Sequence, residues 1–568
     1  MKQFLKYSCF VMLACLTALS GHARTVNIDV DAIRGDITKA LRSTCEKVAI
    51  SDTVVMNFGK GTYTINGTIQ CRCHTVIKGL GKDKTTIILN KGNDSGGFKA
   101  FLDDVFFKVT GRPNYPVSLK INDLTIRLKE HKGIWWQGEA RYAVKVYHAD
   151  GVDIHDVDSY MDNAIITNYD FHVCSNVKIT DCVISNFNNC IDGGNLWFRG
   201  ELHNIVVKRN KFYKYGNDEL LAVFDRVVEN YNNGYVRGKA TRSNIFIEDN
   251  EFYYGGYDKS DKNTSKSAIS HMIVSLFTEQ HKSNDRCTTR NFHVRNNKFY
   301  INDVCTRCMY INFNPADVHE NITIENNEIY NARLKGNDPY YRQDIEVNDL
   351  SSSNDTIRIV NNTVRNKDLV LTEYGTQGYS FLLMQGGNVE LRGNKILNEL
   401  TVDPKTGKDT GVQLIWCGAD GGSVTMRDNV CKGLKFIATV GAGNGTRKFT
   451  LNAENNHFEG DTRIYCHKIE DLDLNFIRNT FVSSDMNFFL QEFASKGKVV
   501  FNYNNVTVKP GNGTLMTHWN TKVPTNAMRF NQLEVKGNIF KGVKNEKEMF
   551  KNMTNTRKRK VSNNTIRQ

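Results

Sequence analysis

Two acidic residues stand directly before an apolar run in YKYGNDELLAVFD, residues 213–225. Asp218 and Glu219 precede the apolar residues 220–224, and Asp225 follows them. A carboxylate is costly to bury without a partner, so these acids are either exposed on one face of a strand or kept for chemistry. Neighbouring carboxylates repel, which raises the pKa of one and leaves a proton donor beside an ionised partner. Hydrolysis of a glycosidic bond requires such a pair.

Two other segments repeat the pattern of this stretch. Aligning AVFD with SLFT sets Asp225 over Thr278 and Asp218 over His271, because both pairs are 53 residues apart (278 − 225 and 271 − 218). In NCIDGGN, Asp192 lies 26 residues before Asp218 (218 − 192). Strands on neighbouring coils are about 4.8 Å apart, so these positions would line one groove. The predicted catalytic set is Asp192, Asp218, Glu219, Asp225 and His271.

Three interpretations of these acids stay open. They supply the acid and base of hydrolysis, they bind calcium that offsets the charge of a uronate substrate, or they are solvated turn residues without chemistry. In the calcium case elimination would need a base, for which His271, Lys239, Arg237 and Arg242 are the nearby candidates. Hydrolysis is slightly favoured over elimination because carboxylates dominate the set. No metal ligand is assigned.

Substrate-binding side chains are expected beside the acids. Trp197 closely follows NCIDGGN, and a flat ring there can stack on a sugar. Most aromatic residues of a repeat protein pack in its interior, so the alternative for Trp197 is packing. The cationic residues Arg226 and Arg237, downstream of Asp225, complete the predicted substrate-binding set.

A repeat defines the elements that must position these residues. From mid-chain onward an alternating strand pattern is followed by Asn, any residue and a large apolar residue, as in NIVVKRNKF, NIFIEDNEF and NITIENNEI. The period of two predicts strands with one buried face. Stacked coils would place the asparagine side chains in a ladder in which each amide satisfies the next. The anchoring residues are Asn210, Asn250, Asn297, Asn327, Asn362, Asn394, Asn429, Asn456, Asn479, Asn504, Asn538 and Asn564.

The repeating unit is one irregular coil rather than a hairpin or a four-stranded blade, which predicts an all-β parallel β-helix, a solenoid. Residues 31–48 form the one convincing amphipathic helix, and the open end of a solenoid needs a cap. The segments GKGTY, residues 59–63, and IKGLGKDKTTI, residues 77–87, follow it. This order resembles the entry of the pectate-lyase-like right-handed β-helix superfamily. The resemblance covers the whole mature chain and implies a right-handed coil. Because the superfamily includes lyases, hydrolases, epimerases and phage tailspikes, it assigns no residue a role.

The first 23 residues have a basic start, an apolar centre and small residues at their end, which indicates a secretory signal peptide cut after Ala23. Cys15 leaves lipid anchoring as an alternative. No later segment has the roughly 18 apolar residues needed to cross a bilayer. We expect a cap at residues 24–50 and one β-helix domain at residues 51–568. The mature protein is expected to be a monomer that is secreted or located in the periplasm or at the cell surface.

The net charge and the cysteines limit which partners, disulfides and metal sites are expected. The net charge is +13, and without Lys2 and Lys6 of the leader it is +11 (13 − 2), which favours an anionic polymer; better solubility is the equal alternative. The basic run at residues 557–560 overlaps the final strand pattern, so nucleic acid is not expected as a partner. Twelve cysteines remain after Cys9 and Cys15 (14 − 2), which permits disulfides without fixing their pairing. No CxxC pair has zinc-finger spacing.

The leading hypothesis is a secreted carbohydrate-active enzyme that cleaves an extracellular polysaccharide, with an acidic polymer among the candidates. The rival is a non-catalytic glycan-binding or surface-adhesion solenoid. The sugar, the linkage and any cofactor stay open, calcium being the one ion considered.

Overall fold

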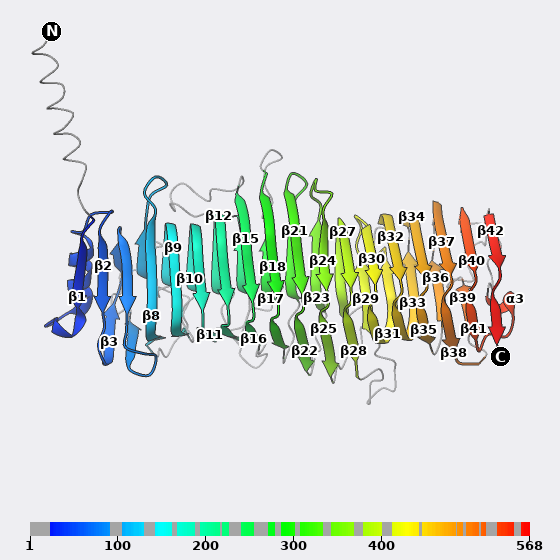
Figure 1. Ribbon diagram of the computed structural model, residues 1–568, viewed down its shortest axis with the longest axis horizontal. Coiled ribbons are helices and arrows are strands. Elements are labelled where there is room, and N and C mark those ends of the chain that lie inside the picture. The colour runs from blue at the N-terminus through cyan, green and yellow to red at the C-terminus, as the bar shows by residue number, and fades with distance from the viewer. Residues whose placement is uncertain are drawn as a thin grey trace, which may run out of the picture.

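The computed structural model describes most of the chain. The described residues are 23–90, 105–129, 142–161, 167–187, 194–215, 218–225, 240–254, 271–278, 286–301, 307–332, 342–367, 379–399, 412–441, 446–467, 469–483, 486–491, 496–510, 513–517, 531–549 and 558–567. Their 43 strands form a right-handed parallel β-helix, as the sequence predicts. Strand β1 and strand β43 lie at opposite ends of the solenoid (Figure 1).

Each coil contributes to three parallel sheets, named here after one strand of each. The β14 sheet contains β4 (Ile69–Cys71), β7 (Val105–Thr110), β9 (Tyr142–Tyr160), β10 (Thr167–Thr180), β12 (Gly194–Lys208), β14 (Asp218–Phe224), β17 (His271–Phe277), β20 (Arg307–Phe313), β23 (Arg342–Asp349), β26 (Tyr379–Gly386), β29 (Val412–Cys417), β31 (Val430–Val440), β33 (His457–His467), β36 (Met486–Gln491) and β39 (Gly513–Thr517).

The β15 sheet contains β1 (Thr25–Asp29), β2 (Thr53–Asn57), β5 (His74–Lys78), β8 (Val117–Leu128), β15 (Thr241–Glu248), β18 (Thr288–Arg295), β21 (Val318–Glu325), β24 (Thr356–Val360), β27 (Asn388–Arg392), β30 (Gly422–Arg427), β32 (Thr446–Glu454), β34 (Ile469–Ile477), β37 (Lys496–Asn502), β40 (Gln532–Lys536) and β42 (Lys558–Ser562). Strands β9, β10 and β12 continue from the β14 sheet into this one.

The β16 sheet contains β3 (Gly61–Asn66), β6 (Thr85–Asn90), β11 (Val183–Phe187), β13 (Lys211–Tyr215), β16 (Glu251–Tyr254), β19 (Lys298–Ile301), β22 (Glu328–Ala332), β25 (Thr363–Lys367), β28 (Lys395–Asn398), β35 (Thr480–Ser483), β38 (Asn505–Val508), β41 (Ile539–Lys541) and β43 (Thr565–Arg567). The ends of β8 and β9 and the starts of β31 and β33 also belong to it.

The predicted N-terminal helix is present as α2 (Ile37–Cys45), shorter than the predicted residues 31–48. It begins after Asp36, whose carboxylate accepts a hydrogen bond from the Lys39 backbone N–H at 3.1 Å. Leu41 and Cys45 are buried against the first coils, where α2 packs on β3 and β4. A second short helix, α3 (Glu546–Met549), lies near the other end. Among the described residues no helix is long and apolar enough to span a membrane.

The start of β14 explains how an acidic pair can precede an apolar run. Leu220 and Leu221 are consecutive, yet both are fully buried in the interior core, so the chain turns a corner there instead of alternating. Alternation begins only at Leu221: Val223 also faces the core, whereas Ala222 and Phe224 belong to a separate outward cluster. Consecutive core residues recur in other strands of the sheet, at Ile273 and Val274, Phe381 and Leu382, and Leu414 and Ile415.

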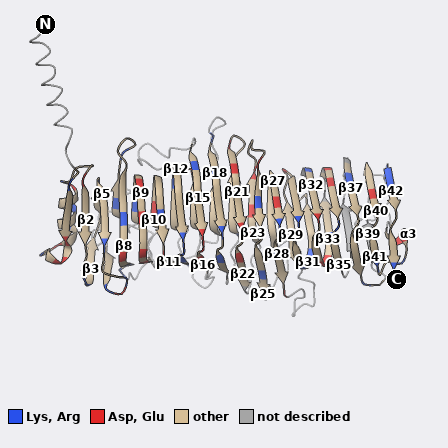
Figure 2. Ribbon diagram, viewed as in Figure 1, with Lys and Arg blue, Asp and Glu red and all other residues tan. Residues whose placement is uncertain are grey.

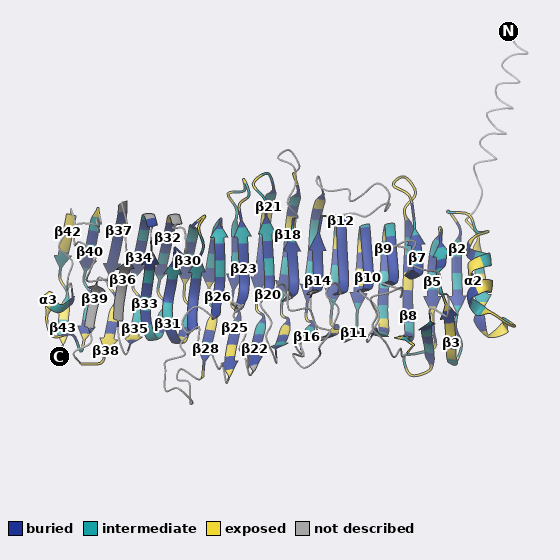
Figure 3. Ribbon diagram, turned by 180° about the vertical axis from the view of Figure 1, so that it is seen from behind, coloured by how far each residue is buried: buried dark blue, intermediate teal, exposed yellow. Residues whose placement is uncertain are grey.

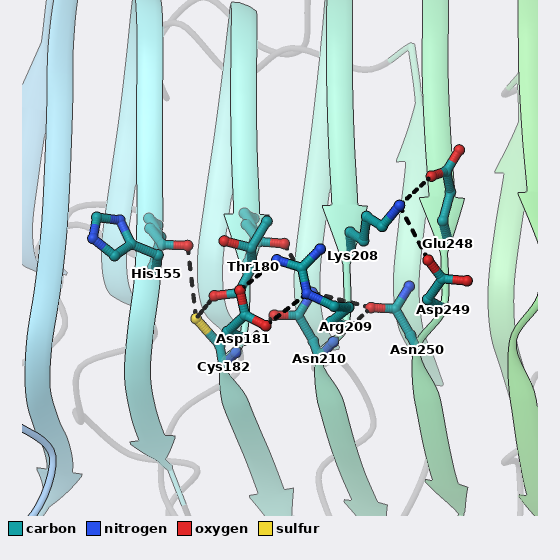
Figure 4. Close-up of polar contacts among 12 residues, drawn as sticks. His155, Thr180, Asp181, Cys182, Lys208, Arg209, Asn210, Glu248, Asp249 and Asn250 are labelled. Carbon is teal, nitrogen blue, oxygen red and sulfur yellow. Dashed lines mark hydrogen bonds and ion pairs between the residues drawn. The ribbon is translucent and has the colours of Figure 1, made fainter.

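The asparagine ladder predicted from the repeat is confirmed. The Asn250 backbone N–H and Nδ2 both donate to Asn297 Oδ1, at 2.9 and 3.0 Å, and the Asn297 N–H and Nδ2 donate likewise to Asn327 Oδ1. The pattern runs from Asn210 to Asn564 (Figure 4 shows Asn210 and Asn250). Each Nδ2 also donates to a strand carbonyl of another coil, as Asn250 does to Val207 at 2.9 Å. Asparagine side chains alone therefore provide hydrogen-bond partners for the backbone groups at this turn in coil after coil.

The residue with left-handed backbone is the one before each ladder asparagine, not the asparagine itself. Arg209, Asp249 and Asn296 have φ of 56°, 54° and 57°. The ladder asparagine occupies the next position, outside the left-handed region. Arg209 and Asp181 pair side by side at this turn (Figure 4).

Acidic and basic residues are interspersed along the strands of the β15 sheet (Figure 2), and some of them form exposed ion pairs. Lys120 Nζ lies 3.6 Å from Asp153 on the next coil, and Arg290 lies 3.2 Å from Glu320. Such exposed pairs each contribute about 0–1 kcal/mol to stability. These exposed pairs therefore favour solubility and contribute little to the stability of the fold.

Candidate functional site

The outward face of the β14 sheet differs from that of the β15 sheet because its N-terminal half is buried (Figure 3). Strands in register stack their outward residues in columns that run along the solenoid. One column contains Lys108, Lys145, Asp170, Trp197 and Ala222, and the next contains Thr110, Tyr147, His172, Arg199 and Phe224.

Four of these residues form a connected charge cluster, called here the Asp170 cluster: Lys145, Asp170, His172 and Arg199. Arg199 Nε donates to Asp170 Oδ1 at 2.7 Å, and His172 Nε2 lies 2.8 Å from Asp170 Oδ2. Lys145 Nζ is 3.4 Å from the same Oδ2. Three consecutive strands, β9, β10 and β12, therefore place three basic side chains around one carboxylate.

The cluster is almost completely removed from solvent. Lys145 is 1% exposed, Asp170 and His172 are 0% exposed, and Arg199 is 5% exposed. Buried charges persist only when they are paired and hydrogen-bonded, which this geometry provides. At these four buried positions an ion network therefore takes the place of hydrophobic packing.

Burial and charge together set the protonation states of the cluster. Burial alone would raise the pKa of Asp170, but Arg199, His172 and Lys145 hold that pKa far below its ordinary value. Burial lowers the pKa of His172 to about 3, against the attraction of Asp170. Burial also lowers the pKa of Lys145 to about 8. At neutral pH Asp170 is ionised, His172 is neutral with its proton on Nε2, and Lys145 is still mostly protonated, with a pKa about one unit above neutral.

Aromatic rings enclose the cluster. Lys145 Nζ lies 4.1 Å from the centroid of the Tyr142 ring, and the Tyr147 ring stacks on His172 at 4.4 Å. The Arg199 guanidinium lies 4.4 Å from the Trp197 ring and 4.3 Å from the Phe224 ring. Such cation–π contacts help to compensate the desolvated cations.

Among the described residues of β10 and β12, the buried polar atoms His172 Nδ1, Trp197 Nε1 and Thr167 Oγ1 have no hydrogen-bond partner. Buried polar atoms are normally paired, so each exception calls for an explanation, of which a catalytic role is one. With its Nε2 hydrogen directed at Asp170, His172 presents Nδ1 as an acceptor, whereas Trp197 presents a donor.

A second group of polar residues lies further along the same face. Glu219 is half-buried and stands in one column with Met272 and Arg307. Arg307 pairs with Glu346, and its guanidinium lies 5.2 Å from the Tyr310 ring. Burial raises the pKa of Tyr310, and the charges of Glu346 and Glu219 add to the shift.

The predicted site residues are only partly within the described chain. Asp192, Arg226, Arg237 and Lys239 lie outside the described residues. The side chains of Asp218 and His271 also lie outside them, but the backbone register pairs Asp218 with His271, as the alignment predicts.

The predicted site residues whose side chains are described lie in different places. Glu219 is on the outward face, whereas Asp225 is 1% exposed at the end of β14, with its Oδ2 3.9 Å from Cys287 Sγ. Trp197 is on the outward face and 8% exposed, between Tyr142 and Phe224. The base candidate Arg242 is 0% exposed and donates to the Phe277 carbonyl at 2.9 Å. The catalytic roles of Glu219 and Asp225 stay predictions.

Sequence reasoning missed the Asp170 cluster. Its signal is a pair of polar or aromatic residues two positions apart within otherwise apolar strands: KVY at residues 145–147, DFH at 170–172 and WFR at 197–199. The three segments begin 25 and 27 residues apart (170 − 145 and 197 − 170), which is the length of one coil. A search for polar residues at coil spacing on one strand face would have found them.

Stacked tyrosines on the β16 sheet are not a platform for sugars. Tyr213, Tyr253, Tyr300 and Tyr330 stack with ring centroids 4.8, 4.8 and 5.1 Å apart and interplanar angles of 7–10°. Each inner ring has both faces covered by its neighbours, so no face is left for a sugar. Glu251 and Glu328 accept hydrogen bonds from the Tyr253 and Tyr330 hydroxyls.

No group of three or more His, Cys, Asp or Glu side chains within the described segments is arranged to hold a metal ion. The predicted calcium alternative rests partly on Asp192 and Asp218, whose side chains lie outside the described residues, and it remains a prediction.

Comparisons with known proteins add little to this site. No family model and no curated protein sequence matches the chain. Among solved structures, the catalytic domain of an α-1,3-glucanase of glycoside hydrolase family 87, in complex with tetrasaccharides, has a TM-score of 0.34 and 12% identity over 91% of this chain and 69% of that one. An alginate lyase from Paenibacillus has a TM-score of 0.27 and 10% identity over 78% of this chain and 99% of that one. An alginate lyase of polysaccharide lyase family 6 has a TM-score of 0.20 and 10% identity over 95% of this chain and 100% of that one. Likeness at this level assigns no activity.

Proposed function

We propose that the protein is a secreted enzyme that binds a polysaccharide along the outward face of the β14 sheet and cleaves it beside the Asp170 cluster. The observation that carries the proposal is the cluster itself, in which Arg199, His172 and Lys145 surround one buried carboxylate on an outward face. An outward-facing ion network that leaves polar atoms unpartnered is more expensive than apolar packing, and perturbed groups of this kind concentrate at active sites.

The protonation states favour elimination from an acidic polymer. Elimination removes the proton on the carbon next to a uronate carboxylate and expels the glycosidic oxygen as the double bond forms. Arg199 would neutralise that carboxylate, and Lys145, with a pKa of about 8, would take the proton. The expelled oxygen needs a proton, for which the half-buried hydroxyl side chain of Tyr147 is the candidate. Because Lys145 is 1% exposed, this chemistry requires an opening motion that admits substrate.

Hydrolysis is the second candidate, favoured by the position of Glu219. Asp170 is ionised and held by three basic groups, so it cannot donate a proton. A hydrolytic acid would come instead from Glu219, which is half-buried on the same face, with Asp192 or Asp218 as its partner. The net positive charge of the chain is compatible with either reaction on an acidic polymer.

The test is a screen of uronate-containing and neutral polysaccharides with the purified mature protein. Elimination yields an unsaturated product that absorbs in the ultraviolet, whereas hydrolysis yields new reducing ends without that absorbance. For elimination, Lys145→Met should lower kcat/KM at least about 100-fold, and activity of the unaltered protein should rise with pH through about 8. Lys298→Met is the matched control, since Lys298 is exposed on the β16 sheet.

Other outcomes separate the alternatives. Loss of reducing-end formation in Glu219→Gln, with Lys145→Met unaffected, would support hydrolysis and contradict elimination. Tight retention of a glycan without any loss of chain length would support the non-catalytic binding protein. A circular-dichroism melting curve for each variant distinguishes lost chemistry from lost folding.

A further inference from the structure

Two thiols meet where the N-terminal cap docks on the solenoid. Cys45 is the last residue of α2 and Cys71 the last residue of β4, and their sulfurs are 3.2 Å apart. Both are free thiols and both are buried, with 2% and 1% of their surface exposed. They are 26 residues apart in sequence, so contact between them is a property of the folded cap.

The docking of α2 fixes the position of Cys45 independently of the sulfur contact. One face of the helix presents Thr38, Arg42 and Cys45, which are four and three residues apart and so lie on successive turns. The Thr38 hydroxyl accepts a hydrogen bond from the Asn66 backbone N–H at 2.7 Å, and Arg42 Nε donates to the Thr68 carbonyl at 2.9 Å. The helix therefore lies against residues 66–71 with one contact per turn, and the last of these contacts joins the two sulfurs.

We propose that Cys45 and Cys71 are a disulfide-forming pair that fastens the cap helix covalently to the first coils when the protein meets a disulfide-bearing oxidant. A disulfide has an Sγ–Sγ distance of about 2.05 Å, so the two sulfurs, now 3.2 Å apart, need to approach by about 1.2 Å. The inference does not depend on the proposed activity, because the cap lies at the end of the solenoid and the Asp170 cluster lies on the outward face of the β14 sheet.

The chemistry is a thiol–disulfide exchange in two steps. The Cys45 thiolate attacks glutathione disulfide, which releases one glutathione and leaves a mixed disulfide. Cys71 then loses its proton, attacks the Cys45 sulfur and releases the second glutathione. In total the two thiols lose two protons and two electrons, and the oxidant is reduced to two glutathione thiols.

The protonation states agree with this order. The hydrogen bond from Cys71 lowers the pKa of Cys45, and the same contact raises the pKa of Cys71 well above its ordinary value. Cys45 is thus the attacking thiol. Cys73, two residues beyond Cys71, is equally buried, and burial raises its pKa to about 11. Cys73 is therefore the natural comparison within the same strand end.

Peptide mapping of the full chain tests the proposal. The purified protein is fully reduced, incubated with a glutathione redox buffer, denatured with an alkylating agent and digested with trypsin without reductant. Arg72 lies between Cys71 and Cys73, so trypsin separates the two candidates into peptides 61–72 and 73–78, while Cys45 lies in peptide 43–47. The expected result is peptide 43–47 linked to peptide 61–72, with Cys73 alkylated.

Variants and a proteolysis assay complete the test. Cys73→Ser should keep the link, and Cys71→Ser should leave Cys45 alkylated. In the native protein, oxidation should slow cleavage within residues 23–52 several-fold, and Cys71→Ser should show no such slowing. Alkylation of both Cys45 and Cys71 in the oxidised sample, a link from Cys45 to Cys73, or equal cleavage rates with and without oxidation would each overturn the proposal.

Discussion

The asparagine ladder and the Asp170 cluster both stack buried polar groups on consecutive coils, yet they solve different problems. In the ladder the same residue recurs, and from Asn250 onward each Oδ1 accepts two hydrogen bonds from the coil before it. In the cluster every coil supplies a different residue, and His172 Nδ1 is left without a partner. By repeating one neutral side chain, the solenoid pairs the hydrogen-bonding groups that are buried at its turns. In the Asp170 cluster this repetition is broken, because charged groups stand in place of amides.

The two regions also differ in what holds them together. An amide carries no net charge, so its burial costs only hydrogen bonds, all of which the neighbouring coils replace. Each member of the Asp170 cluster carries or borders a charge whose desolvation is offset only by its partners. The ladder should therefore tolerate changes of pH, whereas the cluster should not.

Removing the carboxylate at the centre of the cluster should have the largest effect. Asp170→Asn leaves Lys145 and Arg199 buried without a counter-charge, and we expect a loss of about 3–5 kcal/mol in the free energy of unfolding. Urea denaturation measures it. Asp153→Asn is the control, because Asp153 is 42% exposed in its pair with Lys120 and should cost less than about 1 kcal/mol. Equal losses in both variants would show that the cluster is not a network of mutually dependent charges.

Breaking one rung of the ladder should have the next largest effect. Asn297→Ala removes the acceptor of two Asn250 donors and the donor to the Ile247 carbonyl, so we expect a loss of about 2–4 kcal/mol. Its control is Asn291→Gly, because Asn291 belongs to a more exposed asparagine row and has a φ of 54°, which glycine adopts freely. A loss in Asn291→Gly as large as that in Asn297→Ala would contradict the importance of burial.

Lowering the pH should reduce the free energy of unfolding through the Asp170 cluster and not through the ladder, by an amount smaller than the effects above. The pKa of His172 is about 3 in the folded protein and about 6.5 when unfolded, so the unfolded state binds more protons between these values. Stability is therefore present above pH 6.5 and is lost as pH falls toward 3, by about 2 kcal/mol between pH 7 and pH 5. Urea midpoints at the two pH values measure this loss.

The matched variant for the pH experiment is His172→Gln, which keeps a donor toward Asp170 but does not titrate. We expect its midpoint to change less than that of the unaltered protein between pH 7 and pH 5. The same pH dependence in both proteins would assign the effect to groups outside the cluster.

The smallest effect should come from the residue just before a ladder asparagine. Arg209→Gly removes an exposed pair with Asp181 but relieves a left-handed backbone at φ 56°. The two changes oppose each other, and we expect the free energy of unfolding to stay within about 1 kcal/mol. Thermal melting checks it. A large loss would mean that the exposed pair, and not Asn210, holds this turn.

The ladder could be predicted from sequence because its evidence is repeated. Asn210, Asn250 and Asn297 each follow an alternating strand and precede a large apolar residue, so any one of them is weak evidence and twelve together fix the coil. The register of Asp218 with His271 was predicted in the same way and is confirmed.

The cluster could not be predicted by that reasoning. Lys145, Asp170 and Arg199 share no residue type, and no two of them lie on the same strand, so only the coil spacing joins them. A search for paired carboxylates does not detect Asp170, because it is a single acid whose neighbours are basic. The corner at Leu220 and Leu221 was missed for a different reason: strict alternation assigns consecutive residues to opposite faces, and a bend in the chain lets both point inward.

The ladder carries one more implication, for the length of the molecule. Its rungs are separated by between 23 and 47 residues, yet every rung makes the same bonds. The hydrogen bonds of a rung do not depend on the length of the loops in its coil or on the number of coils before it. A whole turn can thus be gained or lost with both flanking rungs joining directly, so the length of the outward face of the β14 sheet can change while the architecture persists.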